Sequence, residues 1–389
     1  MIATEKIIYL DNNATTPIDP AVLEAMRPFL EEYFANPSSG YQFATRVRNA
    51  VEQAREQVAA LLGCEPGEIV FTSCGTESNN TAFHSALETR PECKHVVTTA
   101  VEHSAVRKPA QELEQHGYKV TVIGVDNSGR LSLRALADAI CADTALISVM
   151  WANNETGVIF PIEEIAEVAR DKNVPLHTDA VQVAGKIPIN LRELPLQFLS
   201  ISGHKLHAPK GVGALYVNRR SRFRPLLVGG SHENNRRAGT ENAASIVGLG
   251  KAAEIALAKL PDEQTRVRNL RDRFEKMLLE RIAAARVNGI GAPRLANTSS
   301  VMFDEIESEA ALMMLDQENI CCSAGSACRT GSLHPSHVLS AMGLVNEQAR
   351  GSLRFSFGRF STEAEVDRAL DVVPRVIEKL RALSPATAG

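Results

Sequence analysis

Short apolar runs alternate with amphipathic stretches along the first two thirds of the chain. The apolar runs predict strands at 68–73, 95–100, 119–125, 145–151, 176–181, 198–203 and 213–217. Helices are predicted between these strands, among them 79–88, 133–140 and 161–172, the last with Pro161 in its first turn. Alternating strands and helices indicate an α/β fold with a mostly parallel sheet of the seven-stranded type, covered by helices on both faces.

The stretch 41–63 carries the clearest helical periodicity. Apolar residues recur there on one face at the spacing of an α-helix, and Gly63 ends the pattern. The predicted buried face consists of Phe43, Val47, Val51, Ala54, Val58 and Leu61. We expect this helix to pack its apolar face against the core.

The pattern changes near residues 259–262. The segments expected after this change are a charged helix at 265–285, strands at 299–303 and 351–358, and a helix at 364–383. We therefore predict a large domain at 15–260, and a smaller α+β domain made of 1–14 and 261–389. Because ligands of open α/β sheets bind at the carboxyl ends of the strands, we expect the site there, near the junction with the small domain.

Composition argues against several classes of protein. The 389 residues carry a formal net charge of −4, and no block of like charges indicates a nucleic-acid partner. The first residues lack the apolar segment of a signal peptide, and no apolar run approaches the ~20 residues of a membrane span. The seven cysteines are odd in number and form no C-x-x-C pair, which suits a reducing compartment. We expect a cytoplasmic protein with neither a nucleic-acid nor a membrane partner.

Lys205 and Asp179 each lie at the end of a predicted strand. A pyridoxal phosphate enzyme needs such a pair, because the lysine forms a Schiff base with the cofactor aldehyde and the acid keeps the pyridine nitrogen protonated. Ser202 and His204 flank the lysine and are suited to bind the cofactor phosphate. Lys210 is a second candidate lysine, but it follows a proline in a polar loop, so we favour Lys205.

Other strand ends carry candidate residues with ordinary alternatives. Gly75 and Thr76 lie where a strand turns into a helix, which suits either a phosphate seat or a simple N-cap. His103 could stack on the pyridine ring and move protons, although a lone histidine is usually structural. Asn154 and Gln182 could donate to the phenolate oxygen of the cofactor, or could be turn residues.

Three features lie outside the predicted sheet. Cys328 stands among small residues beside Arg329, in a stretch that predicts an exposed loop, where a thiolate can act as a nucleophile. The alternative is an inert surface thiol. Arg354, in an alternating strand, offers a fork for a substrate α-carboxylate, or forms a surface ion pair. The basic loop 236–242, with Thr240, could reach an anion across a subunit interface.

Several motifs together resemble a known family. They are LDNNATTP, FTSCGTES, SVMWANNETG, HTDAVQ, SGHKLHAPKGVG, RRAGTENAAS, SAGSACRTGSLHPSHV and LRFSFGRF. In these motifs, from about Tyr9 to about Ile377, the chain is similar to the cysteine desulfurases of the NifS/IscS group. DNNATT and SVMWANNETG look closer to the NifS branch, which serves nitrogenase maturation.

The resemblance implies a fold-type-I pyridoxal phosphate enzyme that works as a homodimer. Such an enzyme converts L-cysteine to L-alanine and leaves a persulfide on itself, which an iron–sulfur scaffold protein accepts. By motif matching, the sulfur would pass through Cys328, which could also be a transient iron–sulfur ligand shared with the scaffold. The substrate carboxylate would be bound by Arg354, Asn13 and Asn154.

The resemblance also implies the cofactor contacts. Lys205 would form the Schiff base, Asp179 would pair with the pyridine nitrogen, and His103 would stack on the ring and act as acid and base. Asn154 and Gln182 would contact the phenolate oxygen. The phosphate would be held by Gly75, Thr76, Ser202, His204 and Thr240 of the partner subunit.

Two rival functions differ from this expectation in a testable way. The nearer rival is another pyridoxal phosphate enzyme on the same fold, such as an aminotransferase or a selenocysteine lyase. An aminotransferase would not need Cys328. A non-catalytic iron–sulfur carrier using Cys321, Cys322 and Cys328 would need neither Lys205 nor Asp179, and would be colourless as purified.

Overall fold

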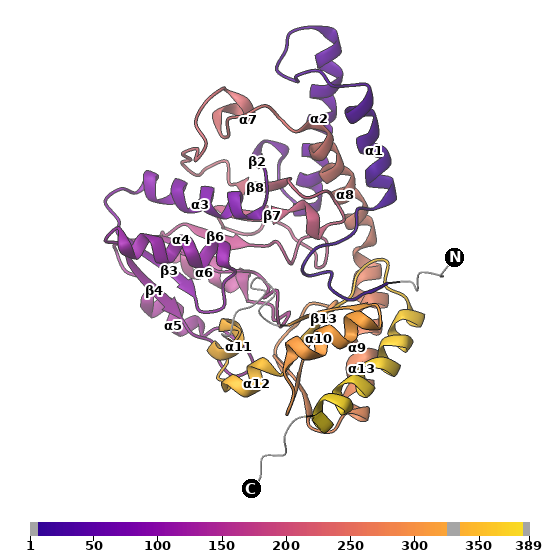
Figure 1. Cartoon of the computed structure of the whole chain (residues 1–389). Coiled ribbons are helices and arrows are strands. Elements are labelled where there is room, and N and C mark those ends of the chain that lie inside the picture. The colour runs from indigo at the N-terminus through magenta and orange to yellow at the C-terminus, as the bar shows by residue number, and fades with distance from the viewer. Residues whose placement is uncertain (1–6, 325–334, 384–389) are drawn as a thin grey trace.

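One large sheet dominates the computed structural model, which describes residues 7–324 and 335–383 (Figure 1). Its seven strands follow the order β2-β8-β7-β6-β5-β3-β4. They are β2 (Ile69–Thr72), β3 (His95–Thr99), β4 (Lys119–Ile123), β5 (Thr144–Ser148), β6 (Leu176–Asp179), β7 (Phe198–Ser202) and β8 (Gly213–Val217). β8 runs antiparallel to both neighbours and all other pairs are parallel. The predicted mostly parallel seven-stranded sheet is confirmed.

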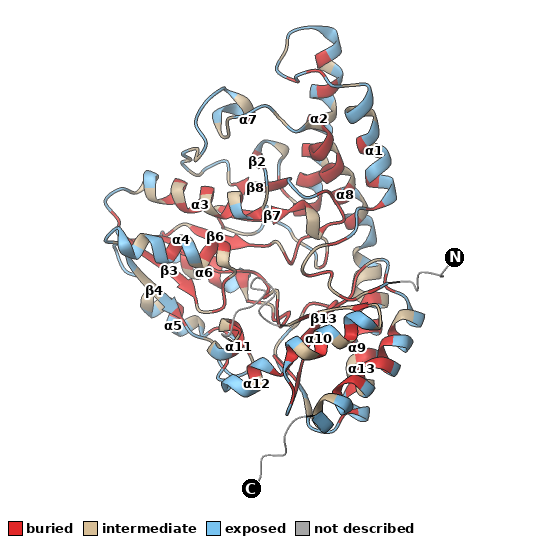
Figure 2. Ribbon diagram, viewed as in Figure 1, coloured by how far each residue is buried: buried red, intermediate tan, exposed pale blue. Residues whose placement is uncertain are grey.

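Helices cover both faces of this sheet. They are α1 (Pro20–Glu31), α2 (Gln42–Leu62), α3 (Gly75–Thr89), α4 (Ser104–Gln115), α5 (Leu133–Ala139), α6 (Ile162–Asp171), α7 (His232–Asn235) and α8 (Ala243–Asp262). Successive strand residues point to opposite faces, so Val96 packs in a core with α3 and α4, whereas Val97 packs in a core with α2, α6 and α8. Buried residues accordingly fill the strands, apart from the edge strand β4, and the inner sides of the helices (Figure 2).

The helix predicted at 41–63 is α2, and Gly63 ends it in the left-handed conformation with a φ of 62°. A Cβ at this position would lie 2.8 Å from Cα of Asn190, so the close approach of the segment between β6 and β7 also requires glycine. The prediction is wrong for one residue of the buried face. Phe43 is 40% exposed and packs edge-on against Phe34, because the first turn of α2 extends past the main core.

A second core lies in the C-terminal third, where β12-β13-β10-β9 form a sheet and β1 pairs with β11. The strands are β1 (Ile8–Tyr9), β9 (Ala285–Val287), β10 (Thr298–Phe303), β11 (Ile320–Cys321), β12 (Ser323–Ala324) and β13 (Ser352–Ser356). The helices that pack in this core are α9 (Arg268–Arg281), α10 (Ser308–Gln317) and α13 (Glu363–Leu383). Two short helices of this third, α11 (His337–Ala341) and α12 (Asn346–Arg350), instead contribute buried residues to the core of the large sheet. Ile8 and Leu10 belong to the second core, so the N-terminal segment packs with the C-terminal third. Within the described ranges, no helix is long and apolar enough to cross a membrane.

The chain does not leave helical structure at the predicted domain boundary. α8 passes through a π-helical segment, Glu263–Val267, directly into α9. Pro261 lies inside α8 and not in a linker. The division at residue 260 stays a prediction, and the link across it is a continuous helical run.

Candidate functional site

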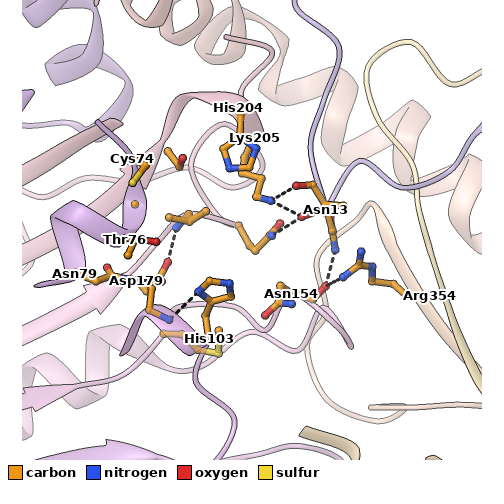
Figure 3. A pocket seen from close by; sticks show the side chains of 17 residues that line it. Asn13, Cys74, Thr76, Asn79, His103, Asn154, Asp179, His204, Lys205 and Arg354 are labelled. Carbon is orange, nitrogen blue, oxygen red and sulfur yellow. Dashed lines mark hydrogen bonds between the residues drawn. The ribbon is translucent and has the colours of Figure 1, made fainter. Parts of the chain in front are cut away.

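A cavity of about 350 Å³ opens at the carboxyl ends of the parallel strands (Figure 3). Every residue predicted for the site lines it except Thr240 and Cys328, and Cys328 lies outside the described residues. Residues that the sequence had not singled out also line it: Ala14, Cys74, Asn79, Ala105, Met150 and Val181. The strand ends of β2, β3, β5, β6 and β7 therefore converge on one hollow, as the topology requires.

Lys205 ends a short turn that follows β7 and extends its amine into the cavity (Figure 3). Its Nζ donates to the backbone carbonyl oxygens of Asn13 (2.7 Å) and Ala14 (2.6 Å). Burial, followed by the charges of Lys186 and Arg354, lowers the pKa of Lys205 to about 7. A large fraction of the amine is therefore uncharged near neutral pH and can attack an aldehyde. The competing Lys210 is exposed.

Asp179 ends β6 and carries its carboxylate into the cavity. One oxygen accepts a hydrogen bond from Nδ2 of Asn79 (2.7 Å) and the other from the backbone N–H of Val181 (3.0 Å). Asn79 is buried, and it lies one helical turn after Gly75, so the same helix face presents both residues to the cavity. That spacing was the signal in the sequence that could have identified Asn79.

Gly75 begins α3, whose free N–H groups and positive dipole end point toward the cavity. A Cβ at Gly75 would lie 2.8 Å from Cγ2 of Val181, so a side chain there would need the neighbouring loop to move. Thr76 and Ser202 line the same end, and Nδ1 of His204 lies 3.1 Å from Oγ1 of Thr15. Burial lowers the pKa of His204 to about 4, so the ring is neutral and contributes hydrogen bonding without charge.

Thr240 is exposed and lines a separate hollow of about 240 Å³. Its loop is tied to α3 by an ion pair between Arg237 and Glu77 (2.9 Å). Within one chain, the structure therefore does not bring Thr240 to the cavity.

His103 is the N-cap of α4, and its Nδ1 accepts a hydrogen bond from the backbone N–H of Ala105 (3.1 Å). In the neutral ring the proton therefore resides on Nε2. Gln182 donates its Nε2 to the carbonyl oxygen of Asn13 (3.0 Å). Both side chains are fixed at the wall of the cavity by these contacts.

Arg354 comes from β13 and brings a buried positive charge to the cavity. Its Nη2 donates to Asp11 (2.6 Å) and its Nη1 to the carbonyl oxygen of Asn154 (3.1 Å). Its Nε is buried and has no partner among the described residues. The amide of Asn13 is committed elsewhere, because its Nδ2 donates to Asn154 and to Thr298.

Comparison with known proteins agrees with this geometry. The family model of the class-V aminotransferases matches residues 8–369. The chain belongs to this family. It is 54% identical to "Cysteine desulfurase 2" of Trichormus variabilis, covering 97% of this chain and 95% of the relative, and 51% identical to "Cysteine desulfurase NifS" of Azotobacter vinelandii, covering 98% and 95%. A solved structure named "NIFS-LIKE PROTEIN" is 36% identical and superposes with a TM-score of 0.90, covering 96% of this chain and all of that one.

Pyridoxal phosphate is the cofactor of this family, which confirms the predicted cofactor. The cavity fits it, because an amine with a lowered pKa, a hydrogen-bonded carboxylate and the N-terminus of a helix face one space. These groups complement an aldehyde, a pyridine nitrogen and a phosphate. Its volume lies within the ~300–1,000 Å³ of small-molecule pockets. In the described part of the chain, no group of three or more His, Cys, Asp or Glu side chains is arranged to hold a metal ion.

Proposed function

We propose that the protein is a cysteine desulfurase that removes sulfur from L-cysteine, releases L-alanine and carries the sulfur as a persulfide on Cys328. The observation that supports this best is the meeting of Lys205, Asp179 and Arg354 around one cavity. They offer an amine for an aldehyde, a carboxylate for a pyridine nitrogen and a guanidinium for an amino-acid carboxylate. Relatives that share about half of the sequence carry the name cysteine desulfurase.

The residues around the cavity divide the binding and proton transfers among them. Bound pyridoxal phosphate supplies an electron sink for the negative charge that develops at Cα of the substrate. Asp179, held by Asn79, keeps the ring nitrogen protonated. The N–H groups at the start of α3 bind the phosphate. Lys205 removes the proton from Cα, because burial leaves much of its amine uncharged near neutral pH.

Arg354 orients the substrate. The hydrogens of its fork that Asp11 and Asn154 do not occupy bind the α-carboxylate. Asp11 holds the guanidinium from the other side, so the fork keeps one direction in the cavity. His103, with its Nε2 directed by the contact at Nδ1, is placed to exchange a proton with the bound substrate.

The sulfur transfer conserves electrons without an external oxidant. The thiolate of Cys328 forms a bond to the sulfur of the bound cysteine, and the bond from that sulfur to Cβ breaks. The electron pair of the broken bond goes to the carbon skeleton, which is reduced, while sulfur is oxidised to the persulfide. Protons delivered to Cβ and Cα, from His103 and Lys205, complete alanine.

A homodimer would complete the phosphate site, since Thr240 lies away from the cavity of its own chain. Thr240 of the partner subunit would then contact the phosphate, and the Arg237–Glu77 ion pair would hold its loop. To test this, a Lys205→Ala protein is mixed with a Thr240→Ala protein under subunit exchange. Heterodimers carry one intact site, so activity should appear above that of either parent. A monomer that keeps full activity at high dilution would refute the shared site.

The physiological role that fits is sulfur supply for iron–sulfur cluster assembly, including that of nitrogenase, with a scaffold protein as acceptor. The NifS-like relatives support this assignment. Cys328 would deliver the sulfur and could be a transient iron–sulfur ligand shared with the scaffold. The enzyme would be cytoplasmic, with a large domain at 15–260 and a small domain at 1–14 and 261–389. The two cores support this division in outline, but Leu295, Val338, Leu339, Met342 and Ala349 of the small domain join the core of the large sheet.

The direct test is incubation of the purified protein with L-cysteine, with alanine and sulfide measured in the presence and absence of a thiol reductant. A desulfurase forms alanine in both cases, and sulfide rises strongly when the reductant cleaves the persulfide. An aminotransferase would instead form no alanine from cysteine alone and would require an added 2-oxo acid. That second outcome would overturn the proposal.

A further inference from the structure

Lys186 is a buried lysine to which the reaction described above assigns no task. Lys186 is 8% exposed and lies in the segment after β6, in the same turn-rich stretch as Gln182. Its Nζ donates a hydrogen bond to Oε1 of Gln182 over 3.1 Å. Lysine is among the residues that are almost never fully buried without a partner, so this placement calls for an explanation.

Two contacts, with Lys186 and with the Asn13 carbonyl, together orient the Gln182 amide. A lysine ammonium has three donors and no acceptor, so only the amide oxygen of Gln182 can face it. The amide nitrogen must then lie on the other side, where one of its hydrogens is donated to the carbonyl oxygen of Asn13 over 3.0 Å. The second hydrogen is left for an acceptor in the cavity, which Gln182 lines.

Lys186 also brings charge behind the reactive amine. A second cavity of about 30 Å³, large enough for a water molecule, is lined by Lys186, Lys205 and Glu263. The charge of Lys186 is the second cause, after burial, that lowers the pKa of Lys205. Burial likewise lowers the pKa of Lys186, and Glu263 opposes this.

Other ionisable groups also act on this pair. Those that change the pKa of Lys205 besides Lys186 are Arg354, Asp11 and Asp179. Those that line the small cavity with Lys186 and Lys205 are His207, Lys259, Asp262, Glu263 and Arg359. Because Arg354 and Asp179 are expected to bind substrate and cofactor directly, Lys186 and Glu263 are the pair whose charge can be changed with least effect on binding groups.

We propose that Lys186 is a positioning residue of the cofactor pocket: it turns the amide nitrogen of Gln182 toward the bound cofactor and keeps a positive charge behind Lys205. This rests on the cofactor that the cavity fits, not on the identity of the substrate. An amide donor aimed at the phenolate oxygen and a cation behind the lysine both disfavour a proton on the nitrogen that links Lys205 to the cofactor. Lys186 would thereby keep that linkage unprotonated over a wider pH range.

The test is a pH titration of the visible absorption of the holoenzyme without substrate, which follows the proton on the Lys205–cofactor linkage. Lys186→Met should raise the pKa of the linkage by about one pH unit, since it removes the charge and one of the two contacts that orient the Gln182 amide. Lys186→Arg, which keeps a charged donor, should leave it near the wild-type value. Glu263→Gln should lower it, because it removes the negative charge that offsets Lys186.

A second measurement isolates the amide orientation. Pyridoxamine phosphate, which cannot form the linkage, should bind the apoprotein of Lys186→Met severalfold more weakly than that of Lys186→Arg. If Lys186 were purely structural, Lys186→Met would lower the melting temperature. The linkage pKa would then not rise in Lys186→Met and fall in Glu263→Gln. An unchanged linkage pKa in both variants would overturn the proposal. If Lys186→Met does not fold, the direction seen in Glu263→Gln still decides. None of these readouts needs alanine formation, so they remain valid if the desulfurase assignment fails.

Discussion

The pH at which pyridoxal phosphate joins the apoprotein tests the environment of Lys205 directly. Burial lowers the pKa of Lys205 from the usual 10.5 to about 7. At pH 7 about half of its amines are uncharged, whereas about 1 in 3,000 amines with a pKa of 10.5 are uncharged. Since only the uncharged amine attacks an aldehyde, the rate of linkage formation should rise only about twofold between pH 7 and pH 9. An ordinary lysine would gain about a hundredfold over the same range.

The assay is stopped-flow absorbance after mixing the apoprotein with a fixed excess of pyridoxal phosphate. The second pKa of the cofactor phosphate is about 6, so its charge changes by only about a tenth of a unit between pH 7 and pH 9. Nα-acetyl-lysine amide, whose only amine is the ε-amine, serves as the reference for an unperturbed amine. Lys210→Ala should behave as the wild type, whereas Lys205→Ala should form no linkage, and mass spectrometry after borohydride reduction should find the cofactor on Lys205.

A rate that climbs about a hundredfold between pH 7 and pH 9 would show that the amine is not desolvated in the way its contacts imply. The hydrogen bonds from Nζ to the Asn13 and Ala14 carbonyl oxygens would then hold a permanently charged ammonium. A reduced cofactor found on Lys210 would refute the assignment of the lysine itself.

Two further predictions concern the sulfur chemistry and a buried ion pair between α2 and α7. Cys328→Ala should still bind the cofactor and L-cysteine but should form alanine and sulfide on the order of a thousandfold more slowly; Cys321→Ala should stay active, and a persulfide trapped by alkylation on Cys321 would contradict the choice of nucleophile. Glu233→Ala should lower the free energy of unfolding by about 3–5 kcal/mol in denaturant titrations, because it leaves the buried Arg55 (2.7 Å from Glu233) without its buried carboxylate partner. Glu52→Ala is the control: it removes an exposed partner of Arg55 and should lower the same free energy by less than about 1 kcal/mol.

The strands and the residues at their ends could be predicted because both follow from local pattern. Each strand of the large sheet is a short apolar run between polar turns, and parallel topology brings the strand ends to one edge. Lys205, Asp179 and Gly75 were found in this way. Phe43 was assigned to the buried face in error, because periodicity does not show where a helix extends past its core.

The supporting contacts could not be predicted, because they join residues that are far apart in the sequence. Arg354 and Asp11 are 343 positions apart, and Asn79 and Asp179 are 100 apart. No spacing rule connects such pairs, since each depends on how two separately predicted segments pack. The helical run through residue 260 was missed for the opposite reason: Pro261 and the change of composition suggested a break, yet the backbone adapts through a π-helical segment.

That helical run connects the two cores rigidly, so that they cannot move independently of each other. α8 packs in the core of the large sheet and α9 packs in the C-terminal core, so both ends of the helical run from Ala243 to Arg281 are held in place. Bending is cheapest in the π-helical turn, where the regular backbone ladder is already interrupted. Arg266 of that turn donates to the carbonyl oxygens of Arg359 and Ser361, and these two hydrogen bonds limit how far the turn can bend. Any movement of the two cores that widens the cavity must therefore bend this helical run. Dividing the chain at residue 260 would cut through the helix and would not yield two domains that fold independently.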